Sequence, residues 1–198
     1  MVCLTRGRGA AGRGHVFSLV LGGEIMPIRI VLFDLFGTLV DMSGVPREEM
    51  ADYARQIARP TWEPLVLPAS WNALKTFDDV GPGLSALSEL PGVLTVTLSN
   101  APMALQAELM SHNWLFVGAY MAFCFPVAMV GAYKPNPEVY RAALRVFPEL
   151  SPDQFLMVTA NEQFGDLEGA AACGMQTMLI RGDTGLDVRS VAERVKNG

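Results

Sequence analysis

The hydrophobic positions of the chain fall into short apolar runs separated by amphipathic segments. The apolar runs predict strands over 29–34, 93–98, 122–126, 155–160 and 176–180. The segments between them predict helices over 82–90, 103–111, 137–147, 166–173 and 186–196. Strands that alternate with helices are typical of an α/β fold with a doubly wound parallel sheet.

Polar side chains follow the first two of these runs. Asp34 ends the first run and is followed by Gly37 and Thr38, whereas Ser99 and Asn100 end the second. In open α/β sheets, ligands bind at the carboxyl ends of the strands. Asp34 is therefore a candidate nucleophile, a candidate metal ligand or a simple turn cap.

Two further polar groups follow later in the chain. Lys134 lies in Tyr-Lys-Pro-Asn-Pro, before the amphipathic stretch 138–147, and Asn161 follows the fourth run with Asp166 five residues later. The chain thus has four polar motifs in a fixed order: Asp, Ser-Asn, Lys-Pro and Asn…Asp. This order resembles the four motifs of the haloacid dehalogenase (HAD) superfamily. The resemblance extends from about residue 28 to residue 185 and implies a Rossmann-like sheet.

The residue two positions after Asp34 separates two kinds of enzyme within that superfamily. Most of its phosphatases have a second Asp there, which protonates the leaving alkoxide, but this chain has Phe36. A phenyl ring donates no proton, and a halide leaves without one. Because the type II (L-)2-haloacid dehalogenases have an aromatic residue at this position, the chain resembles them here. This resemblance implies a hydrolase that dehalogenates a short 2-haloalkanoic acid through an ester on Asp34.

The same resemblance implies roles for the other catalytic candidates. Lys134 would lie beside Asp34 and keep it ionised, because an adjacent cation lowers the pKa of a carboxyl group. Asp166 would orient or activate the hydrolytic water, and its alternative role is to cap the helix that follows. Thr38 and Asn161 complete the predicted catalytic set.

Six residues are candidates for contacting the substrate or the halide: Phe36, Ser99, Asn100, Arg55, Tyr140 and Thr159. The hydroxyl and amide groups after the second strand are suited to hold a carboxylate or a halide. Tyr140 matches a tyrosine of the dehalogenases in its spacing from the lysine, or packs in the core. Thr159 stands in Thr-Ala-Asn, which resembles their Ser-Ser-Asn.

A cap insertion is predicted over about 42–77, with one helix from Pro46 to Ala58 and a short second helix. Arg55-Gln56 resembles the cap segment that supplies a halide-binding Arg in the dehalogenases, and Arg59 is its nearest competitor. The Trp, Leu and Pro residues that follow predict an apolar lid. Such a lid could bind a halogenated carbon or pack in a homodimer.

The spacing of the last motif bears on metal binding. The gap of five residues between Asn161 and Asp166 fits the Gly-Asp-x-x-x-Asn-Asp form of the phosphatases, with Asn161 in place of the first Asp. Only Asp34 and Asp166 would remain as carboxylate ligands for Mg²⁺. We therefore expect no required metal and no other cofactor. The alternatives are a Mg²⁺-dependent phosphatase acting on a small ester, and a catalytically weak HAD-fold binding protein.

The composition of the chain excludes some classes of binding partner. The 198 residues carry a net charge of −5 with no basic stripe, which argues against nucleic acid or an anionic membrane surface and leaves a small-molecule substrate. The three cysteines lack metal or disulfide spacing, which favours a reducing cytoplasm. Residues 1–25 are Arg- and Gly-rich without hydrophobic periodicity and are predicted to be a disordered extension of a single hydrolase domain over 26–198.

Overall fold

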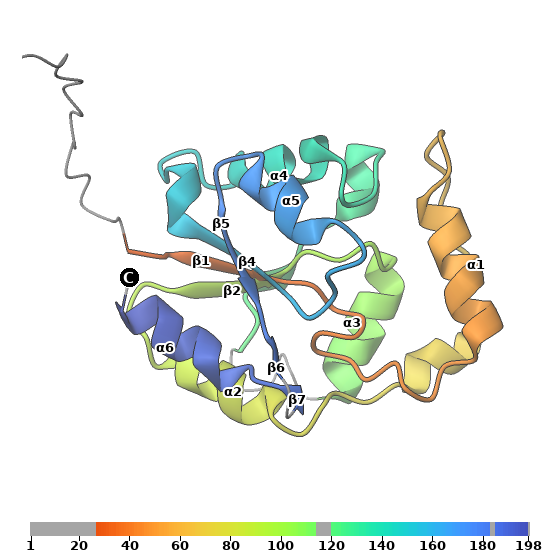
Figure 1. Ribbon diagram of the computed structural model, residues 1–198, viewed down its shortest axis with the longest axis horizontal. Coiled ribbons are helices and arrows are strands. Elements are labelled where there is room, and N and C mark those ends of the chain that lie inside the picture. The colour runs from red at the N-terminus through yellow and green to blue at the C-terminus, as the bar shows by residue number, and fades with distance from the viewer. Residues whose placement is uncertain (1–26, 114–119, 183–184, 198) are drawn as a thin grey trace, which may run out of the picture.

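The computed structural model describes residues 27–113, 120–182 and 185–197. The predicted extension at 1–25 lies outside these residues. Within them, five parallel strands form a sheet in the order β3-β2-β1-β4-β5 (Figure 1). The strands are β1 (Ile30–Phe33), β2 (Leu94–Thr97), β3 (Phe123–Cys124), β4 (Phe155–Thr159) and β5 (Gln176–Leu179). The predicted α/β class and parallel sheet are confirmed.

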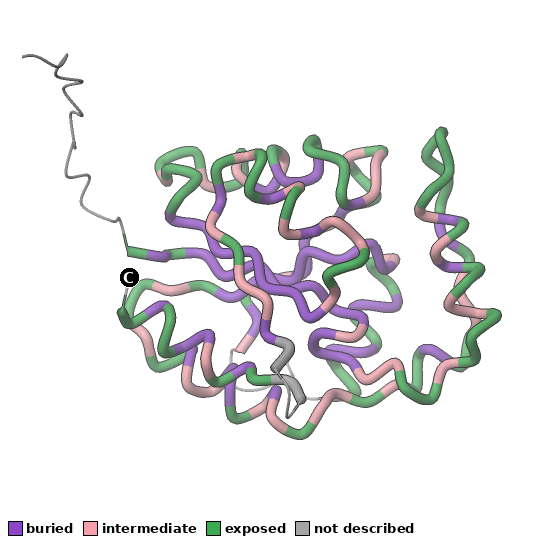
Figure 2. The backbone as a smooth tube through the Cα atoms, viewed as in Figure 1, coloured by how far each residue is buried: buried purple, intermediate pink, exposed green. Residues whose placement is uncertain are grey.

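Helices cover both faces of the sheet. One face packs against α2 (Val80–Ser88), α3 (Met103–His112) and α6 (Arg189–Asn197), and the other packs against α4 (Pro137–Leu144) and α5 (Asp166–Ala171). Alternate residues of β1 serve the two cores, with Val31 and Phe33 on one face and Ile30 and Leu32 on the other. Both faces of the central strands are therefore buried (Figure 2), as is usual for parallel sheets.

The last predicted helix begins later than the hydrophobic pattern indicates. The pattern places its start at 186, but α6 begins at Arg189. Two of the residues before it form a strand instead, because β7 (Gly185–Leu186) pairs antiparallel with β6 (Arg181–Gly182). Short 3-10 turns complete the fold: η2 (Val127–Val130) and η3 (Pro152–Gln154).

The chain between β1 and α2 contains α1 (Arg47–Ile57) and the 3-10 turn η1 (Ala69–Ala73). Figure 1 shows α1 standing beyond the carboxyl ends of the central strands, apart from the two helical layers. Two glutamates, Glu48 and Glu49, lie in its first turn and Arg55 in its last, which suits the helix dipole. No helix among the described residues is both long and apolar enough to cross a membrane.

Candidate active site

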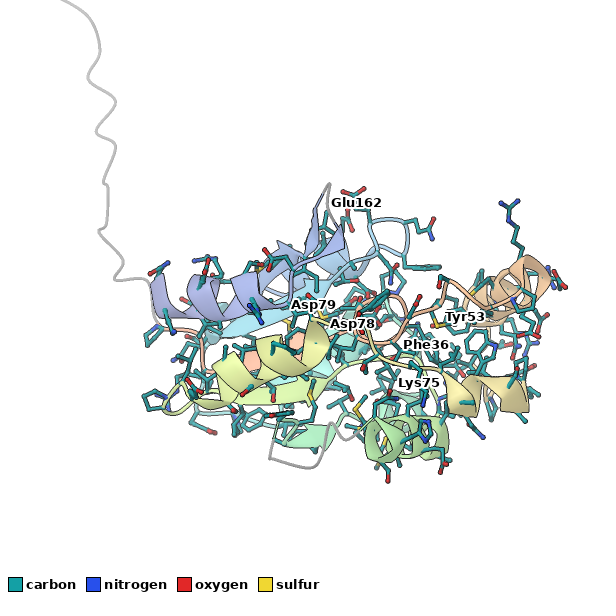
Figure 3. All side chains as sticks on the ribbon, turned by 90° about the horizontal axis from the view of Figure 1, so that it is seen from below. Phe36, Tyr53, Lys75, Asp78, Asp79 and Glu162 are labelled. Carbon is teal, nitrogen blue, oxygen red and sulfur yellow. The ribbon has the colours of Figure 1, made fainter. Side chains whose placement is uncertain are left out.

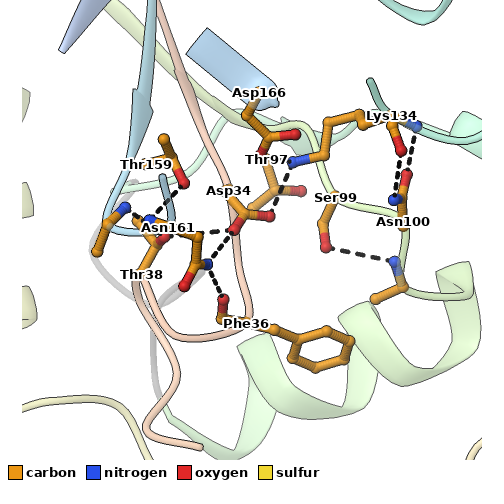
Figure 4. Close-up of polar contacts among 12 residues, drawn as sticks. Asp34, Phe36, Thr38, Thr97, Ser99, Asn100, Lys134, Thr159, Asn161 and Asp166 are labelled. Carbon is orange, nitrogen blue, oxygen red and sulfur yellow. Dashed lines mark hydrogen bonds and ion pairs between the residues drawn. The ribbon is translucent and has the colours of Figure 1, made fainter. Parts of the chain in front are cut away.

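Two carboxylates share one ammonium group at the carboxyl edge of the sheet. Lys134 Nζ lies 2.8 Å from Asp34 Oδ1 and 2.7 Å from Asp166 Oδ2 (Figure 4). Asp34 directly follows β1, Asp166 is the first residue of α5, and Lys134 precedes α4. All three side chains are buried. We call these residues the Asp–Lys–Asp cluster. The alternative role of Asp166 as a helix cap is not observed, because Gly165 holds the capping position.

The second oxygen of Asp34 accepts hydrogen bonds from two neutral side chains. Thr38 Oγ1 donates to Asp34 Oδ2 over 3.3 Å, and Asn161 Nδ2 donates to the same oxygen over 3.1 Å. Thr38 also accepts a bond of 2.9 Å from the backbone N–H of Ala160, which ties the turn after β1 to the end of β4. The carboxylate is thus held at both oxygens.

The turn after β1 depends on Gly37. This residue has φ of +76°, a left-handed conformation that favours glycine. A Cβ atom there would lie 3.0 Å from Asn161 Oδ1, which is closer than most side-chain contacts. Without that atom, Asn161 Nδ2 reaches the carbonyl of Phe36 at 2.7 Å as well as Asp34. Gly37 therefore allows the close approach that positions Asn161.

Burial and charge shift the pKa values inside the Asp–Lys–Asp cluster. Burial lowers the pKa of Lys134, but the negative charges and hydrogen bonds of Asp166 and Asp34 outweigh it and leave the pKa above its ordinary value. Burial raises the pKa of Asp166, and repulsion from Asp34 raises it further, against the opposing effect of Lys134. Lys134 is thus a cation at neutral pH, and Asp166 is a stronger base than an ordinary aspartate.

Tyr140 extends the cluster from α4. Its hydroxyl donates to Asp166 Oδ1 over 3.3 Å, and the side chain is fully buried. Burial raises the pKa of Tyr140 well above its usual range, and the charge of Asp166 adds to this effect. The phenol therefore remains a neutral donor, and the same side chain packs in the core of its face of the sheet.

The motif after β2 holds the backbone of the lysine. Asn100 Nδ2 donates to the carbonyl oxygen of Lys134 over 3.2 Å, and Asn100 Oδ1 accepts from the N–H of Lys134 over 2.8 Å. Ser99 Oγ accepts from the N–H of Ala101 over 3.3 Å, and Thr159 Oγ1 accepts from the N–H of Asn161 over 3.1 Å. In the structure these groups orient neighbouring segments, and their predicted contact with substrate stays a prediction.

A cavity of about 70 Å³ opens beside the cluster. Asp34, Asn100, Lys134, Asn161 and Asp166 line its polar side. Its other side is apolar and is formed by Phe36, Met42, Met50, Tyr53, Ile57 and Phe164. In Figure 3, Phe36 and Tyr53 lie next to each other between α1 and the sheet, and their ring centroids are 5.7 Å apart. The cavity can hold a small molecule with an apolar part facing α1.

The structure does not bring Arg55 into this group. Its side chain is 69% exposed, and its guanidinium pairs with Asp52 over 3.0 Å along α1. Gln56, beside it in the motif, is buried and bonds to Asp52 and to the backbone of Val66. Arg59 pairs with Glu63 and lines a separate surface hollow. Neither arginine lines the cavity.

Sequence reasoning missed the residues that α1 does place against the cavity. Met50, Tyr53 and Ile57 line it, and Gln163 and Phe164 line it from the loop before α5. The positions 50, 53 and 57 follow helical spacing and share one face of α1. This apolar periodicity was a readable signal in the sequence, whereas nothing local marks the loop residues.

The site fits Mg²⁺ poorly. Each carboxylate of the cluster already binds the Lys134 ammonium, and Asn161 turns N–H groups rather than an oxygen toward Asp34. Mg²⁺ needs oxygen ligands in near-octahedral geometry. In the ranges that the structure describes, no three His, Cys, Asp or Glu side chains gather as ligands.

Comparison with known proteins gives a structural match only. No family model and no curated protein matches the sequence. Among solved structures, the L-2-haloacid dehalogenase RSc1362 is similar, with 23% identity, a TM-score of 0.67 and coverage of 86% of this chain and 100% of that one. An L-2-haloacid dehalogenase from Xanthobacter autotrophicus with chloropropionic acid covalently bound shares 19% identity and a TM-score of 0.61, over 86% and 83% of the two chains.

CbbY from Rhodobacter sphaeroides, solved in complex with phosphate, is also similar. It shares 16% identity and a TM-score of 0.59, over 78% of this chain and 87% of that one. The similar structures thus include both dehalogenases and a protein that binds phosphate. The chain therefore has the fold shared by the haloacid dehalogenases and their relatives.

Proposed function

We propose that this protein is a hydrolase that removes halide from a short 2-haloalkanoic acid, with Asp34 as the nucleophile. The observation that carries the proposal is the position of Asp34, which borders a small half-apolar cavity with Phe36 as its neighbour. The group needed to protonate an alkoxide is absent at that position, and a halide needs no such group. The solved dehalogenases of similar fold support the same chemistry.

In the first step, a carboxylate oxygen of Asp34 attacks C2 of the substrate. The new C–O bond forms as the carbon–halogen bond breaks, and the electron pair of that bond leaves with the halide. The Asp34 oxygens have different partners: Lys134 at Oδ1, and the neutral donors Thr38 and Asn161 at Oδ2. We assign the attack to Oδ1, which leaves Oδ2 as the carbonyl oxygen of the ester.

In the second step, water adds to the ester carbonyl of Asp34 and the bond between the acyl carbon and the alkyl oxygen breaks. Lys134, which lies at Oδ1, gives a proton to the departing alkyl oxygen so that the 2-hydroxy acid leaves, and the proton that Asp166 takes from the water passes back to Lys134. Negative charge develops on Oδ2, where Thr38 and Asn161 donate, and preorganised donors stabilise such an oxyanion. Asp166 is suited to take the proton of the water because burial and Asp34 raise its pKa.

The test is halide release from racemic 2-chloro- and 2-bromopropionate, with and without EDTA. Wild-type protein should release halide in EDTA, and Asp34→Asn should abolish release. Asp52→Asn is the matched control, because it makes the same change on the exposed side of α1. A single turnover in ¹⁸O-water should place label on the Asp34 carboxylate.

A parallel assay with p-nitrophenyl phosphate tests the competing chemistry. Nitrophenol release that needs Mg²⁺, without halide release from either acid, would overturn the proposal in favour of a phosphatase. Absence of both activities would favour a binding protein.

A further inference from the structure

The cavity-facing side of α1 carries a single polar group. Met50, Tyr53 and Ile57 line the cavity from this helix, and only Tyr53 has a hydrogen-bonding side chain. Arg55 lies off this face and pairs with Asp52 in solvent. Any polar contact between α1 and a ligand in the cavity therefore falls to the phenol of Tyr53.

Three aromatic rings hold the ring of Tyr53 in place. Its centroid lies 5.7 Å from that of Phe36, 5.8 Å from that of Trp71 and 6.5 Å from that of Phe164. The residue is 7% exposed. Trp71 is fixed in turn, because its indole N–H donates to Glu49 Oε2 over 2.7 Å. Ring packing of this kind positions the hydroxyl without a flexible side chain.

Tyr53 lines the same cavity as the charged groups of the site. Burial raises the pKa of Tyr53 well above its ordinary value, and the negative charges of Asp34 and Asp166 raise it further, while a hydrogen bond with the side chain of Asn100 acts in the opposite direction. The phenol therefore keeps its proton at neutral pH. It is a hydrogen-bond donor on the apolar side of the cavity.

Most of the other donors around the cavity are engaged or exposed, and Asn100 Nδ2 gives one of its N–H groups to the carbonyl oxygen of Lys134. Lys134 is the only Lys or Arg among the described residues of the lining, and both carboxylates of the cluster share it. The two N–H groups of the Asn161 amide serve Asp34 Oδ2 and the carbonyl of Phe36. Gln163 is exposed at the rim. An anion that forms on the α1 side thus meets Tyr53 as its buried donor.

We propose that the Tyr53 hydroxyl hydrogen-bonds the halide as it leaves C2, a role that rests on the proposed function. Displacement at carbon requires the leaving group to depart on the side opposite the nucleophile. Asp34 lies at the sheet edge and Tyr53 on α1, which stands beyond that edge (Figure 1). The halide takes the electron pair of the carbon–halogen bond, and Tyr53 keeps its proton throughout.

The decisive variant is Tyr53→Phe, which retains the ring and its packing and removes only the hydroxyl. Fluoride accepts hydrogen bonds more strongly than chloride, and chloride more strongly than bromide. The loss of activity in the variant should therefore be largest with 2-fluoropropionate, smaller with the chloro acid and smallest with the bromo acid. We expect a loss of kcat/KM of about 10- to 100-fold on the chloro acid, the range for a hydrogen bond to a charged group.

Two controls separate this role from general structural damage. Tyr133→Phe removes a hydroxyl that bonds to the backbone of Glu63 outside the cavity, and it should leave the ratio of rates on the three acids unchanged. Gln163→Leu removes the exposed donor at the rim. The proposal would be overturned if Tyr53→Phe left the ratio of rates on the three acids unchanged. It would also be overturned if only Gln163→Leu changed that ratio.

Bromide binding provides a readout that does not depend on turnover. Crystals soaked in sodium bromide should show anomalous scattering beside the Tyr53 hydroxyl in the wild type and none in Tyr53→Phe. If the wild type releases no halide from any acid, the proposed function fails. Bromide bound beside Tyr53 would still support the halide site in that case, and a cavity without bromide would overturn it.

Discussion

The two sides of the cavity are built in different ways. On the sheet side, every polar group of the Asp–Lys–Asp cluster has a partner within 3.3 Å, and the partners come from the segments that follow β1 and β4, from the segment just before α4 and from α4 itself. On the α1 side, the contacts are aromatic and apolar. Among the described residues, the side-chain hydrogen bonds that tie α1 to other segments run to Trp71 of η1 and to Val66. Under the proposed function, reactivity resides in the hydrogen-bonded sheet edge, whereas selection of the ligand resides in α1, which has fewer polar contacts with the rest of the fold.

Removing the ammonium should have the largest effect on stability. Lys134→Met leaves two buried carboxylates facing each other, and breaking a buried ion pair in this way costs about 3–5 kcal/mol. Urea unfolding measures the loss. Lys75→Met is the control, because Lys75 is exposed. The double variant Lys134→Met/Asp166→Asn should recover part of the loss, and a single variant as stable as wild type would contradict this view of the cluster.

Alkaline pH should weaken the same cluster reversibly. The charges of Asp166 and Asp34 raise the folded-state pKa of Lys134 above 10.5, despite the opposing effect of burial. Its contribution to stability is therefore complete below pH 10.5 and is lost as the pH rises through the folded-state value. The stability difference between wild type and Lys134→Met should shrink over that range. A difference that stays constant would show that Lys134 does not titrate there.

Loss of the Thr38 hydroxyl should have an intermediate effect. Thr38→Val keeps the shape of the side chain but leaves the buried N–H of Ala160 without its acceptor. An unsatisfied buried donor costs about 1–3 kcal/mol. Denaturant unfolding should show this loss, together with slower halide release, because Asp34 Oδ2 also loses a donor. Thr76→Val, in the segment before α2, is the matched control.

A change on the α1 side should cost less stability and act on substrate binding. Glu49→Ala removes the acceptor of the Trp71 indole N–H, at about 1 kcal/mol. Because Trp71 packs against Phe36 and Tyr53, we expect KM to rise and kcat to fall, since Tyr53 is proposed to bond the departing halide. An unchanged KM and kcat would show that Trp71 does not position Tyr53.

The smallest effect is expected from Arg55→Ala. The side chain is 69% exposed and its guanidinium pairs with Asp52 on the same helix, and such pairs contribute little to stability. The urea midpoint should not move. Measurement of KM for the haloacid then tests the halide-binding role predicted from the sequence, and a KM raised tenfold or more would show that Arg55 enters the site when the ligand binds.

The strand-end pattern predicted the sheet and the gathering of Asp34, Asn100, Lys134, Asn161 and Asp166, because parallel strands bring their carboxyl ends to one edge. The rotation of α1 about its axis could not be predicted from a motif. Arg55-Gln56 matches a local pattern, but the apolar positions 50, 53 and 57 turn the helix so that Arg55 meets solvent. The alternative in which Asp166 only caps α5 is excluded by a backbone feature that no motif marks, since Gly165 takes the capping position in a left-handed conformation.

The contacts of Asp34 join distant parts of the chain. Its partner Lys134 is 100 residues away and Asn161 is 127 residues away. Contacts of such long range form only when the intervening strands have docked, and proteins rich in them fold slowly. A half-assembled chain therefore has no reactive carboxylate, so during refolding the recovery of halide release should lag behind the recovery of helical circular dichroism. Turnover in this protein would thus report the completed fold.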